Sequence, residues 1–307
     1  MKSFCRRGRL SAPVVSLLMV TLLLLNAPPA PVKAQTGARV RPAVLVLDVQ
    51  RNAGAVFVTP VTVYEEGKFF PPVPPQGGVA GRRSFVEVNF RSGLVYHLVF
   101  GGGHAGTVRI KQGYWEDGSY AYGELFPSAE AGERIRGQLH ALATNLPDLA
   151  RPSFSRRAPT PEERAAALEV AKSTYMENKV PAGALAKMEV DNLTAIDVDG
   201  DGRAEMVGSF KVPQPGDDAA PPHFLFLIIE AEGDGYRAAR AEYRFNPKQD
   251  QYPLGREMLS DYLDIDGDGT SEVVTVFTAR DFRDTFRIYQ KKGGKWAHVF
   301  SGGGNVQ

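Results

Sequence analysis

The stretch Asp197-Val198-Asp199-Gly200-Asp201-Gly202-Arg203-Ala204-Glu205 recurs 67 residues later as Asp264-Ile265-Asp266-Gly267-Asp268-Gly269-Thr270-Ser271-Glu272. Each copy carries carboxylates at positions 1, 3, 5 and 9 and glycines at positions 4 and 6. Carboxylates so close together repel one another unless a hard cation lies among their oxygens, and the glycines permit the backbone angles of a tight turn. The pair therefore predicts two calcium-binding loops in a duplicated structural unit.

The odd-numbered positions of each loop are the expected calcium ligands. Positions 1, 3 and 5 aim carboxylates inward, position 7 offers its backbone carbonyl, and the Glu at position 9 completes six to eight oxygens directly or through a water. An EF-hand does not fit, because it needs a bidentate Glu at position 12 and flanking helices. The expected ligands are Asp197, Asp199, Asp201, Arg203 and Glu205 in the first loop and Asp264, Asp266, Asp268, Thr270 and Glu272 in the second.

Strand-like sequence surrounds both loops. The segment Ala195–Phe210 aligns with Tyr262–Phe277, with apolar residues before and after each loop. In each copy a further apolar run, a glycine turn and an aromatic strand follow. Each unit is therefore predicted to be a meander of about four strands, and the second unit is the shorter.

This pattern of strand, DxDGDGxx(D/E) loop and strand resembles the FG-GAP and VCBS-type repeats of integrin alpha-chain propellers and many secreted bacterial proteins. The resemblance covers Asn192 to Phe300. It implies propeller-blade-like sheets and metal ligands at Asp197, Asp199, Asp201 and Glu205 and at Asp264, Asp266, Asp268 and Glu272. Two features differ from the family: the last ligand is Glu instead of Asp, and two repeats are visible where a closed propeller needs about four or more.

An Asp-Gly-Asp-Gly string is also an ordinary turn sequence in which Asp caps its own backbone. Two copies with the same carboxylate spacing and the same apolar flanks favour the ion over this alternative. Calcium as a structural ion is favoured over calcium as a signal, because extracellular modules bind it at roughly 10⁻⁴ to 10⁻³ M.

The N-terminus has the features of an export signal. Basic residues in Met1–Arg9 precede an apolar run, Pro13–Leu25, and Val32-Lys33-Ala34 offers small residues at the −3 and −1 positions of a cleavage site. Residues 1–34 are predicted to be a signal peptide, and the protein to be secreted or periplasmic in the cell envelope. A retained anchor is the alternative, but the run is shorter than the roughly 20 residues of a membrane span. General secretion fits better than the twin-arginine route, because Arg9 stands where that signal prefers an apolar residue.

Charge and cysteine content argue against nucleic-acid binding, disulfides and a cysteine nucleophile. Cleavage after Ala34 removes five of the 36 Lys and Arg residues, which leaves 31 against 35 Asp and Glu and a formal charge of −4. Two calcium ions would cancel this charge, so no basic field for nucleic acid is present. The single cysteine, Cys5, lies in the signal, so the mature chain is expected to have no disulfide and no cysteine nucleophile.

The fold class predicted is mainly β. Residues 35–128 are expected to form a small β-sandwich or barrel, residues 129–189 a connecting strand, linker and helix, and residues 190–307 the two calcium repeats. The apolar runs that predict strands in the first region are Ala43–Leu47, Val61–Tyr64, Phe85–Val88, Val95–Phe100 and Thr107–Ile110.

One amphipathic helix is expected between the two β halves, over residues 160–178. Thr160 and Glu163 form a capping box, and Pro161 suits the first turn. The apolar positions Leu168 and Tyr175 share a face with Ala171. The helix is expected to pack on the second β unit rather than to bind a partner. Before it, Ile135–Ala143 alternates like a strand, and Arg151–Pro159 has the composition of a linker.

Catalytic signals are few. The histidines show no sequence spacing typical of a metal site or a triad, and Gly101–Gly106 lacks the Lys and the following helix of a phosphate-binding loop. Aromatic residues around Trp115 could line a sugar-binding face, although such residues in β domains are usually core or hairpin pairs. The residues concerned are His97, His104, His140, His223 and His298, and, for the sugar face, Tyr114, Trp115, Glu116, Asp117, Tyr120 and Tyr122.

The sequence thus predicts an exported noncatalytic calcium-binding β module that is ligand-binding, adhesive or structural. Its partner would be an unidentified polysaccharide or protein, with no nucleic acid and no stable membrane span after processing. The alternative is a secreted, calcium-stabilised hydrolase or lyase acting on polysaccharide. Its site would use carboxylates such as Glu116, Asp117 and Glu124 as a glycosidase uses its acid/base pair.

Overall fold

The computed structural model describes residues 42–303, apart from 53, 74–76, 116–120, 137–139, 152–154, 215–221, 246–254 and 280–283. The chain divides into Met1–Val40 and a compact unit, Arg41–Gln307, to which all of the described residues belong. The predicted signal peptide, residues 1–34, lies outside the described residues.

Six strands of the N-terminal region form a closed antiparallel barrel. They follow one another in the order β1-β7-β4-β5-β6-β2, and β2 pairs back with β1. A short strand, β3 (Lys68–Phe70), pairs with β2 outside this ring. The barrel strands are β1 (Val44–Asn52), β2 (Ala55–Glu65), β4 (Val95–Phe100), β5 (Gly103–Trp115), β6 (Ala121–Pro127) and β7 (His140–Thr144).

Helix α2 (Gly78–Asn89) corrects one sequence-based expectation, because it contains the segment Phe85–Val88 that was predicted as a strand. A strand would place Val86 and Val88 on one face, whereas here Phe85 and Val86 are buried together and Val88 is 66% exposed. The helix packs on β5 and β6. Glycine is required opposite it, because a Cβ at Gly113 would lie 2.7 Å from both Phe90 and Val86.

The strand predicted within Ile135–Ala143 is a barrel strand, since β7 pairs with β1 on one side and β4 on the other. Two short helices flank it in the chain. The first, α3 (Ala129–Arg134), is capped by the Ser128 side chain, and the second is the 3-10 helix η2 (Pro147–Leu149). The barrel therefore extends in sequence to Thr144.

The C-terminal region contains two four-stranded antiparallel meanders, as the repeat predicted. The first sheet has the order β11-β10-β9-β8 and the second β12-β13-β14-β15. Strands β9 and β13 are related by the 67-residue offset at both ends. The strands are β8 (Glu189–Ile196), β9 (Glu205–Val212), β10 (His223–Glu232), β11 (Gly235–Arg244), β12 (Gly255–Leu263), β13 (Glu272–Ala279), β14 (Asp284–Lys292) and β15 (Lys295–Gly302).

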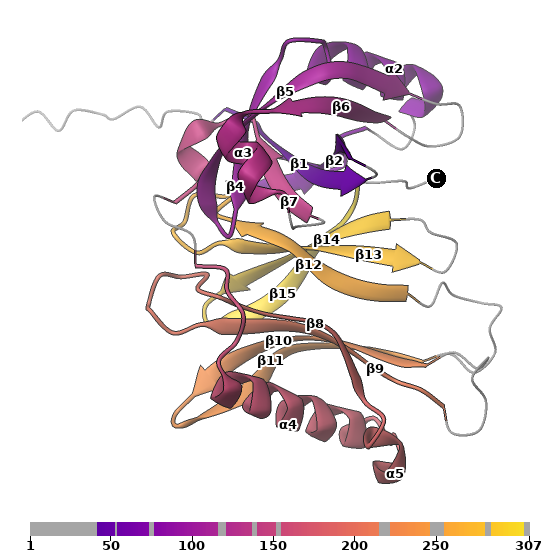
Figure 1. Ribbon diagram of the computed structural model, residues 1–307, viewed down its shortest axis with the longest axis vertical. Helices are drawn as coiled ribbons and strands as arrows, with labels where there is room; N and C mark the ends of the chain where they lie inside the picture. Colours follow the sequence, from indigo (N-terminus) through magenta and orange to yellow (C-terminus); the bar gives the residue numbers. More distant parts are fainter. Residues whose placement is uncertain are drawn as a thin grey trace, which may run out of the picture. The chain divides into compact units, whose positions relative to one another are not determined.

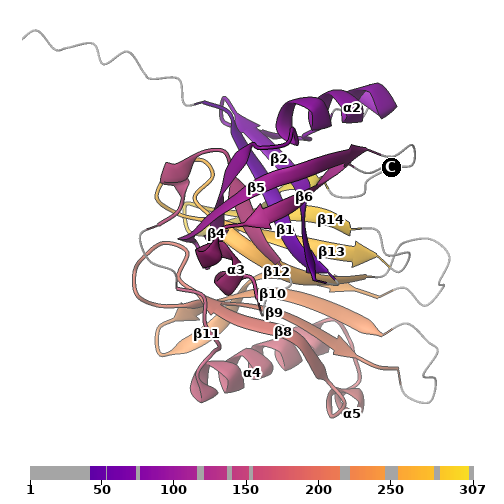
Figure 2. The same cartoon turned by 45° about the horizontal axis from the view of Figure 1, so that its top comes forward.

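The two sheets pack face to face, and each has its other face covered by a different element (Figures 1 and 2). Side chains such as Phe226 and Tyr289 fill the space between the sheets. The outer face of the second sheet packs on the barrel strands through Val276 and Leu142 among others. The outer face of the first sheet packs on the helix α4. Two blade-like sheets therefore bury both of their faces without forming a larger ring.

Helix α4 (Pro161–Glu177) confirms the predicted helix. The capping box of Thr160 and Glu163 is formed, with Pro161 in the first turn and Asn178 at the C-cap. Ala171 and Tyr175 are fully buried against the first sheet, and the Tyr175 hydroxyl donates to the His223 carbonyl at 3.1 Å. A one-turn helix, α5 (Ala182–Leu185), continues this cover.

Within the part of the chain that the structure describes, no helix is both long enough and apolar enough to cross a membrane.

Candidate metal centre

The two acidic loops occupy equivalent places in the two sheets. The first connects β8 to β9 and the second connects β12 to β13. Glycines at positions 4 and 6 adopt positive φ in both loops, 77° and 83° in the first and 77° and 94° in the second. These angles favour glycine, which explains why both copies keep glycine at the same two positions.

The backbone hydrogen bonds of the loops match one for one. The position 1 carboxylate accepts from the N–H groups of positions 4 and 6, at 2.7 and 3.1 Å in the first loop and 2.8 and 3.1 Å in the second. The position 3 carboxylate accepts from position 5 at 3.3 and 3.1 Å. The position 5 carboxylate accepts from position 7 at 2.7 and 2.8 Å. The two loops therefore have the same conformation as well as the same sequence pattern.

The Glu at position 9 is the buried carboxylate of each loop. Glu205 and Glu272 are only 5% and 1% exposed. One oxygen of each accepts from the backbone N–H of position 2, at 3.1 Å from Val198 and 2.7 Å from Ile265. The other oxygen of Glu272 accepts from the Gln290 amide at 2.8 Å, and that of Glu205 lies 3.5 Å from the Lys291 ammonium.

Three of the loop carboxylates, Glu205, Asp264 and Glu272, are costly to ionise in the absence of a cation. Burial, aided by the Asp199 charge, raises the pKa of Glu205 to about 7. Burial and the Asp266 charge raise the pKa of Glu272 to about 8. Burial also raises the pKa of Asp264, and the charges of its loop neighbours add to the effect. A bound divalent cation would reverse this balance by favouring the ionised forms.

The structure brings together three of the predicted carboxylates in each loop. Oxygens of Asp197, Asp199 and Asp201 lie within 4.8 Å of one another in the first loop. Those of Asp264, Asp266 and Glu272 do so in the second. Glu205 and Asp268 are outside these two groups. Arg203 and Thr270, at position 7, donate their N–H groups to the position 5 carboxylates. All the donors are oxygens, which suits a hard cation such as calcium.

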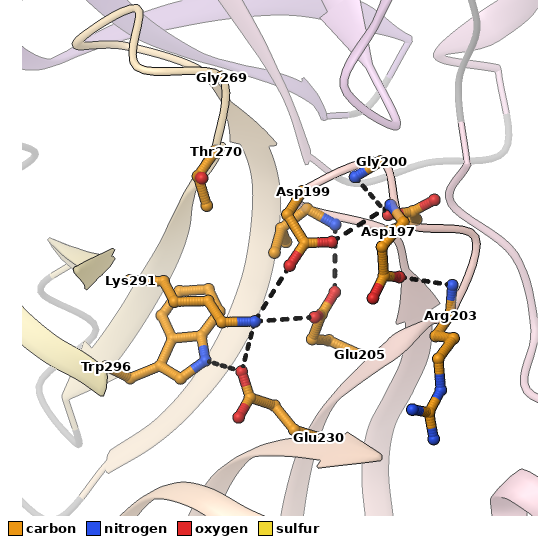
Figure 3. A network of polar contacts seen from close by, with 12 residues as sticks. Asp197, Asp199, Gly200, Arg203, Glu205, Glu230, Gly269, Thr270, Lys291 and Trp296 are labelled. Carbon is orange, nitrogen blue, oxygen red and sulfur yellow. Dashed lines mark hydrogen bonds and ion pairs between the residues drawn. The ribbon is translucent and has the colours of Figure 1, made fainter. Parts of the chain in front are cut away.

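Lys291, from β14 of the second sheet, extends to the first loop (Figure 3). Its ammonium lies 3.1 Å from Asp199, 3.5 Å from Glu205 and 2.8 Å from Glu230. The hydrogen bonds to Glu230 and Asp199 outweigh burial and raise the pKa of Lys291, so it is a fixed positive charge at this loop. The same Glu230 oxygen also accepts from the Trp296 indole N–H at 2.8 Å.

The second loop is contacted by a neutral side chain, Gln290, which occupies the strand position equivalent to Glu230. The Gln290 amide donates to Asp266 at 2.7 Å and to Glu272 at 2.8 Å. Strand register makes Gln290 the counterpart of Glu230, because Tyr289 pairs with Val273 as Ile229 pairs with Met206. Sequence reasoning did not identify Lys291, Gln290 or Glu230. Lys291 and Gln290 lie on a strand outside the loops that they contact, and Glu230 is linked to the first loop through Lys291.

The histidines do not assemble a catalytic group among the described residues. His140 and Ser260 both hydrogen-bond to Asp48, at 3.1 and 2.7 Å, so the carboxylate lies between them. In a hydrolytic triad the histidine takes that middle place. His97 and His104 lie on adjacent strands with ring centroids 6.0 Å apart, and these two form no part of an acidic or metal-binding cluster in the described chain.

The turn Gly101–Gly106, considered above as a phosphate-binding loop, begins as the β4–β5 connection. It is packed against β12: the Gly101 N–H donates to Asp261 at 2.8 Å, and a Cβ at Gly102 would lie 2.4 Å from the Tyr262 ring. This glycine run therefore allows a close approach between the barrel and the second sheet.

The residues of the alternative enzymatic and sugar-binding sites are only partly described. Glu116, Asp117 and Tyr120 lie outside the described residues, and Glu124 is paired with Lys111 at 2.6 Å. Tyr114 and Tyr122 are directly opposite each other on β5 and β6, with stacked rings 4.9 Å apart. Trp115 is 38% exposed. The two tyrosines thus make a cross-strand pair of the kind that stabilises a hairpin.

Comparison of the chain with protein-family models, curated proteins and solved structures found no match.

Proposed function

We propose that this chain is an exported, noncatalytic calcium-binding β module that acts in ligand binding, adhesion or structure in the cell envelope or outside the cell. In this proposal each acidic loop holds one calcium ion. The ligands are the carboxylates at positions 1, 3, 5 and 9, with the carbonyls of Arg203 and Thr270. The resemblance of the repeats to FG-GAP and VCBS-type sequences supports the same reading.

The observation that carries the proposal is the one-for-one match of the loops. Two independent copies keep the same positive φ angles, the same carboxylate-to-backbone hydrogen bonds and the same buried Glu. An ordinary turn needs only its backbone and capping hydrogen bonds, and has no need of a fourth carboxylate buried beside the others. A cation that accepts these oxygens accounts for the fourth carboxylate in both copies.

Calcium would act here as a structural ion. Both loops join strands whose side chains fill the space between the two sheets, so ordering the loops fixes the strand ends that carry this core. With affinities of roughly 10⁻⁴ to 10⁻³ M, a tenfold to hundredfold excess of calcium would add about 1.4 to 2.7 kcal/mol per site to the free energy of unfolding. The ligand or partner of the module would be a polysaccharide or a protein.

Calorimetry of the mature protein with calcium and with a chelator tests the proposal. The expected result is two sites and a melting temperature that falls when the ion is removed. Asp199→Asn and Asp266→Asn should each abolish one site, because each removes a carboxylate from a three-carboxylate group. Asp234→Asn, the same change at an exposed turn outside the loops, is the matched control and should keep both sites. An unchanged melting temperature with no heat on calcium addition would refute the proposal.

A further inference from the structure

Arg151 contacts the backbone of both acidic loops. Its guanidinium donates to the Asp197 carbonyl at 3.0 Å and to the Val198 carbonyl in the first loop. The same group donates to the Gly269 carbonyl of the second loop at 3.1 Å. Arg151 itself belongs to neither repeat, since it follows η2 in the segment that connects the barrel to α4.

The backbone of Arg151 is fixed by the barrel. Its N–H donates to the Gly102 carbonyl at 2.8 Å, and its carbonyl accepts from the His104 N–H at 3.2 Å. These bonds tie Arg151 to the β4–β5 region, which also packs on Tyr262. The guanidinium therefore reaches the loops from an anchored position, and its planar donors can serve several carbonyls at once.

The loops are also bonded to each other directly. The Ser271 N–H, at position 8 of the second loop, donates to the Val198 carbonyl, at position 2 of the first, at 2.8 Å. The Val198 carbonyl thus accepts from both Ser271 and Arg151. A single group of hydrogen bonds therefore joins Asp197 and Val198 of the first loop to Gly269 and Ser271 of the second.

We propose that Arg151 is a positioning residue that couples the two loops, so that a cation bound in one loop raises the affinity of the other. This inference rests on the proposed function. Carbonyls of both loops accept from the one Arg151 guanidinium, so they cannot rearrange separately. Ordering one loop therefore orders part of the second. The second ion then binds a loop whose ordering cost has already been met, which is positive coupling.

Repulsion between two bound divalent ions opposes this effect. Positions 4, 5 and 6 are exposed in both loops, so solvent and salt reach the sites. At 0.15 M ionic strength, charges in solvent are screened over about 8 Å. When two binding sites are coupled, a ligand at one site typically changes the affinity of the other about fivefold or more. Measured at this ionic strength, the positive coupling is therefore expected to exceed the repulsion.

The test measures calcium affinity at the second loop with the first loop intact or disabled. Asp201→Asn disables the first loop and leaves the inter-loop bonds in place, because the Asp201 carboxylate bonds only within its own loop among the described contacts. We expect this change to weaken calcium binding at the second loop about fivefold. In an Arg151→Met background the same change should weaken the second loop less, because only the direct Ser271–Val198 bond then joins the two loops. Arg157→Met is the control, because Arg157 lies in the same segment but pairs with Glu163.

Hydrogen exchange gives a second readout that does not depend on Arg151→Met folding. In Asp266→Asn protein, calcium can fill only the first loop, and the Ser271 amide should then exchange more slowly. Arg151→Lys, which keeps the charge but loses the planar donors, should reduce this protection. Absence of any calcium heat in the unaltered protein would refute the proposed function itself. Calcium binding at two independent sites, or equal coupling with and without Arg151, would overturn the role of Arg151 alone.

Discussion

Gln290 and Lys291 are consecutive residues of β14, yet each contacts a different acidic loop. The Gln290 amide bonds to Asp266 and Glu272 of its own sheet, and the Lys291 ammonium bonds to Asp199 across the interface between the sheets. Alternate side chains of a strand point to opposite faces, which is how one strand reaches both loops. The first loop therefore has a partly buried positive charge, whereas the second is contacted by a neutral amide, with only the exposed Lys292 ammonium 3.7 Å from Asp266.

Replacing Lys291 by Met should strengthen calcium binding at the first loop. The ammonium lies beside Asp199 and Glu205, and its charge opposes an incoming cation. Its removal should raise the calcium affinity of this loop about fivefold, or about 1 kcal/mol. The same change should lower the melting temperature of the calcium-free protein, because Glu205 and Glu230 lose their counter-charge. Lys292→Met is the control, since Lys292 is largely exposed and 3.7 Å from Asp266 of the other loop. Weaker calcium binding in Lys291→Met would contradict this explanation.

The calcium-free protein should lose stability as pH rises from about 4.5 to about 8. The pKa of Glu205 is raised to about 7 and that of Glu272 to about 8, in both cases chiefly by burial. The folded state therefore holds protons that the unfolded chain has released, so the free energy of unfolding falls through this range, by a total on the order of a few kcal/mol. Calcium competes with these protons, so its apparent affinity should rise with pH. Chemical denaturation at pH 5 and pH 8, with calcium and with chelator, measures both trends; equal stability at the two pH values without calcium would contradict them.

The parts of this structure that sequence predicted are those that local pattern specifies. The loops, their strand flanks and the capping box at Thr160 each depend on residues within a few positions of one another. Helix α2 contains a segment predicted as a strand because Phe85-Val86-Glu87-Val88 is a short, mostly apolar run, while Phe90, whose ring packs on Phe85, lies beyond that run. Arg151 lies in a segment with the composition of a linker, and its contacts with both loops exist only because two loops 67 residues apart lie together in the fold. The contact of Lys291 with the first loop depends on which faces of the two sheets pack together, and the sequence does not show this.

His140 should remain protonated to a higher pH than an ordinary histidine. Burial lowers its pKa, but the charge and hydrogen bond of Asp48 and the charge of Asp284 outweigh burial and the opposing charge of Arg156. Since Asp48 also accepts from Ser260 of β12, a protonated His140 stabilises contact between the barrel and the second sheet. That contribution is present below the usual pKa of histidine and is lost as pH rises through the higher, folded-state value. NMR titration of the His140 imidazole should show a midpoint above the ordinary value of about 6.5, and Asp284→Asn should lower it. A His140 midpoint at or below 6.5 would exclude this contribution.

Glu257 should be among the most sensitive positions in the core between the two sheets. Its buried carboxylate accepts from Arg287 at 2.8 Å and from Arg244, and from the Tyr289 hydroxyl at 2.6 Å and Thr275 at 2.8 Å. The two guanidinium charges outweigh burial and hold its pKa below the usual range. Removing the charge leaves two partly buried guanidinium groups without their counter-ion, and breaking such a pair typically costs about 3 to 5 kcal/mol.

Glu257→Gln should therefore lower the free energy of unfolding by about 3 kcal/mol or more, measured by urea denaturation in saturating calcium so that the loops are not the cause. Glu242→Gln, which removes a more exposed partner of Arg240, should cost less than about 1 kcal/mol. Glu257 and Arg244 interact directly between β12 and β11. The double variant Glu257→Gln with Arg244→Gln should therefore recover part of the lost stability. Equal small effects at Glu257 and Glu242 would show that solvent screens the charge at Glu257 as it does at an exposed pair.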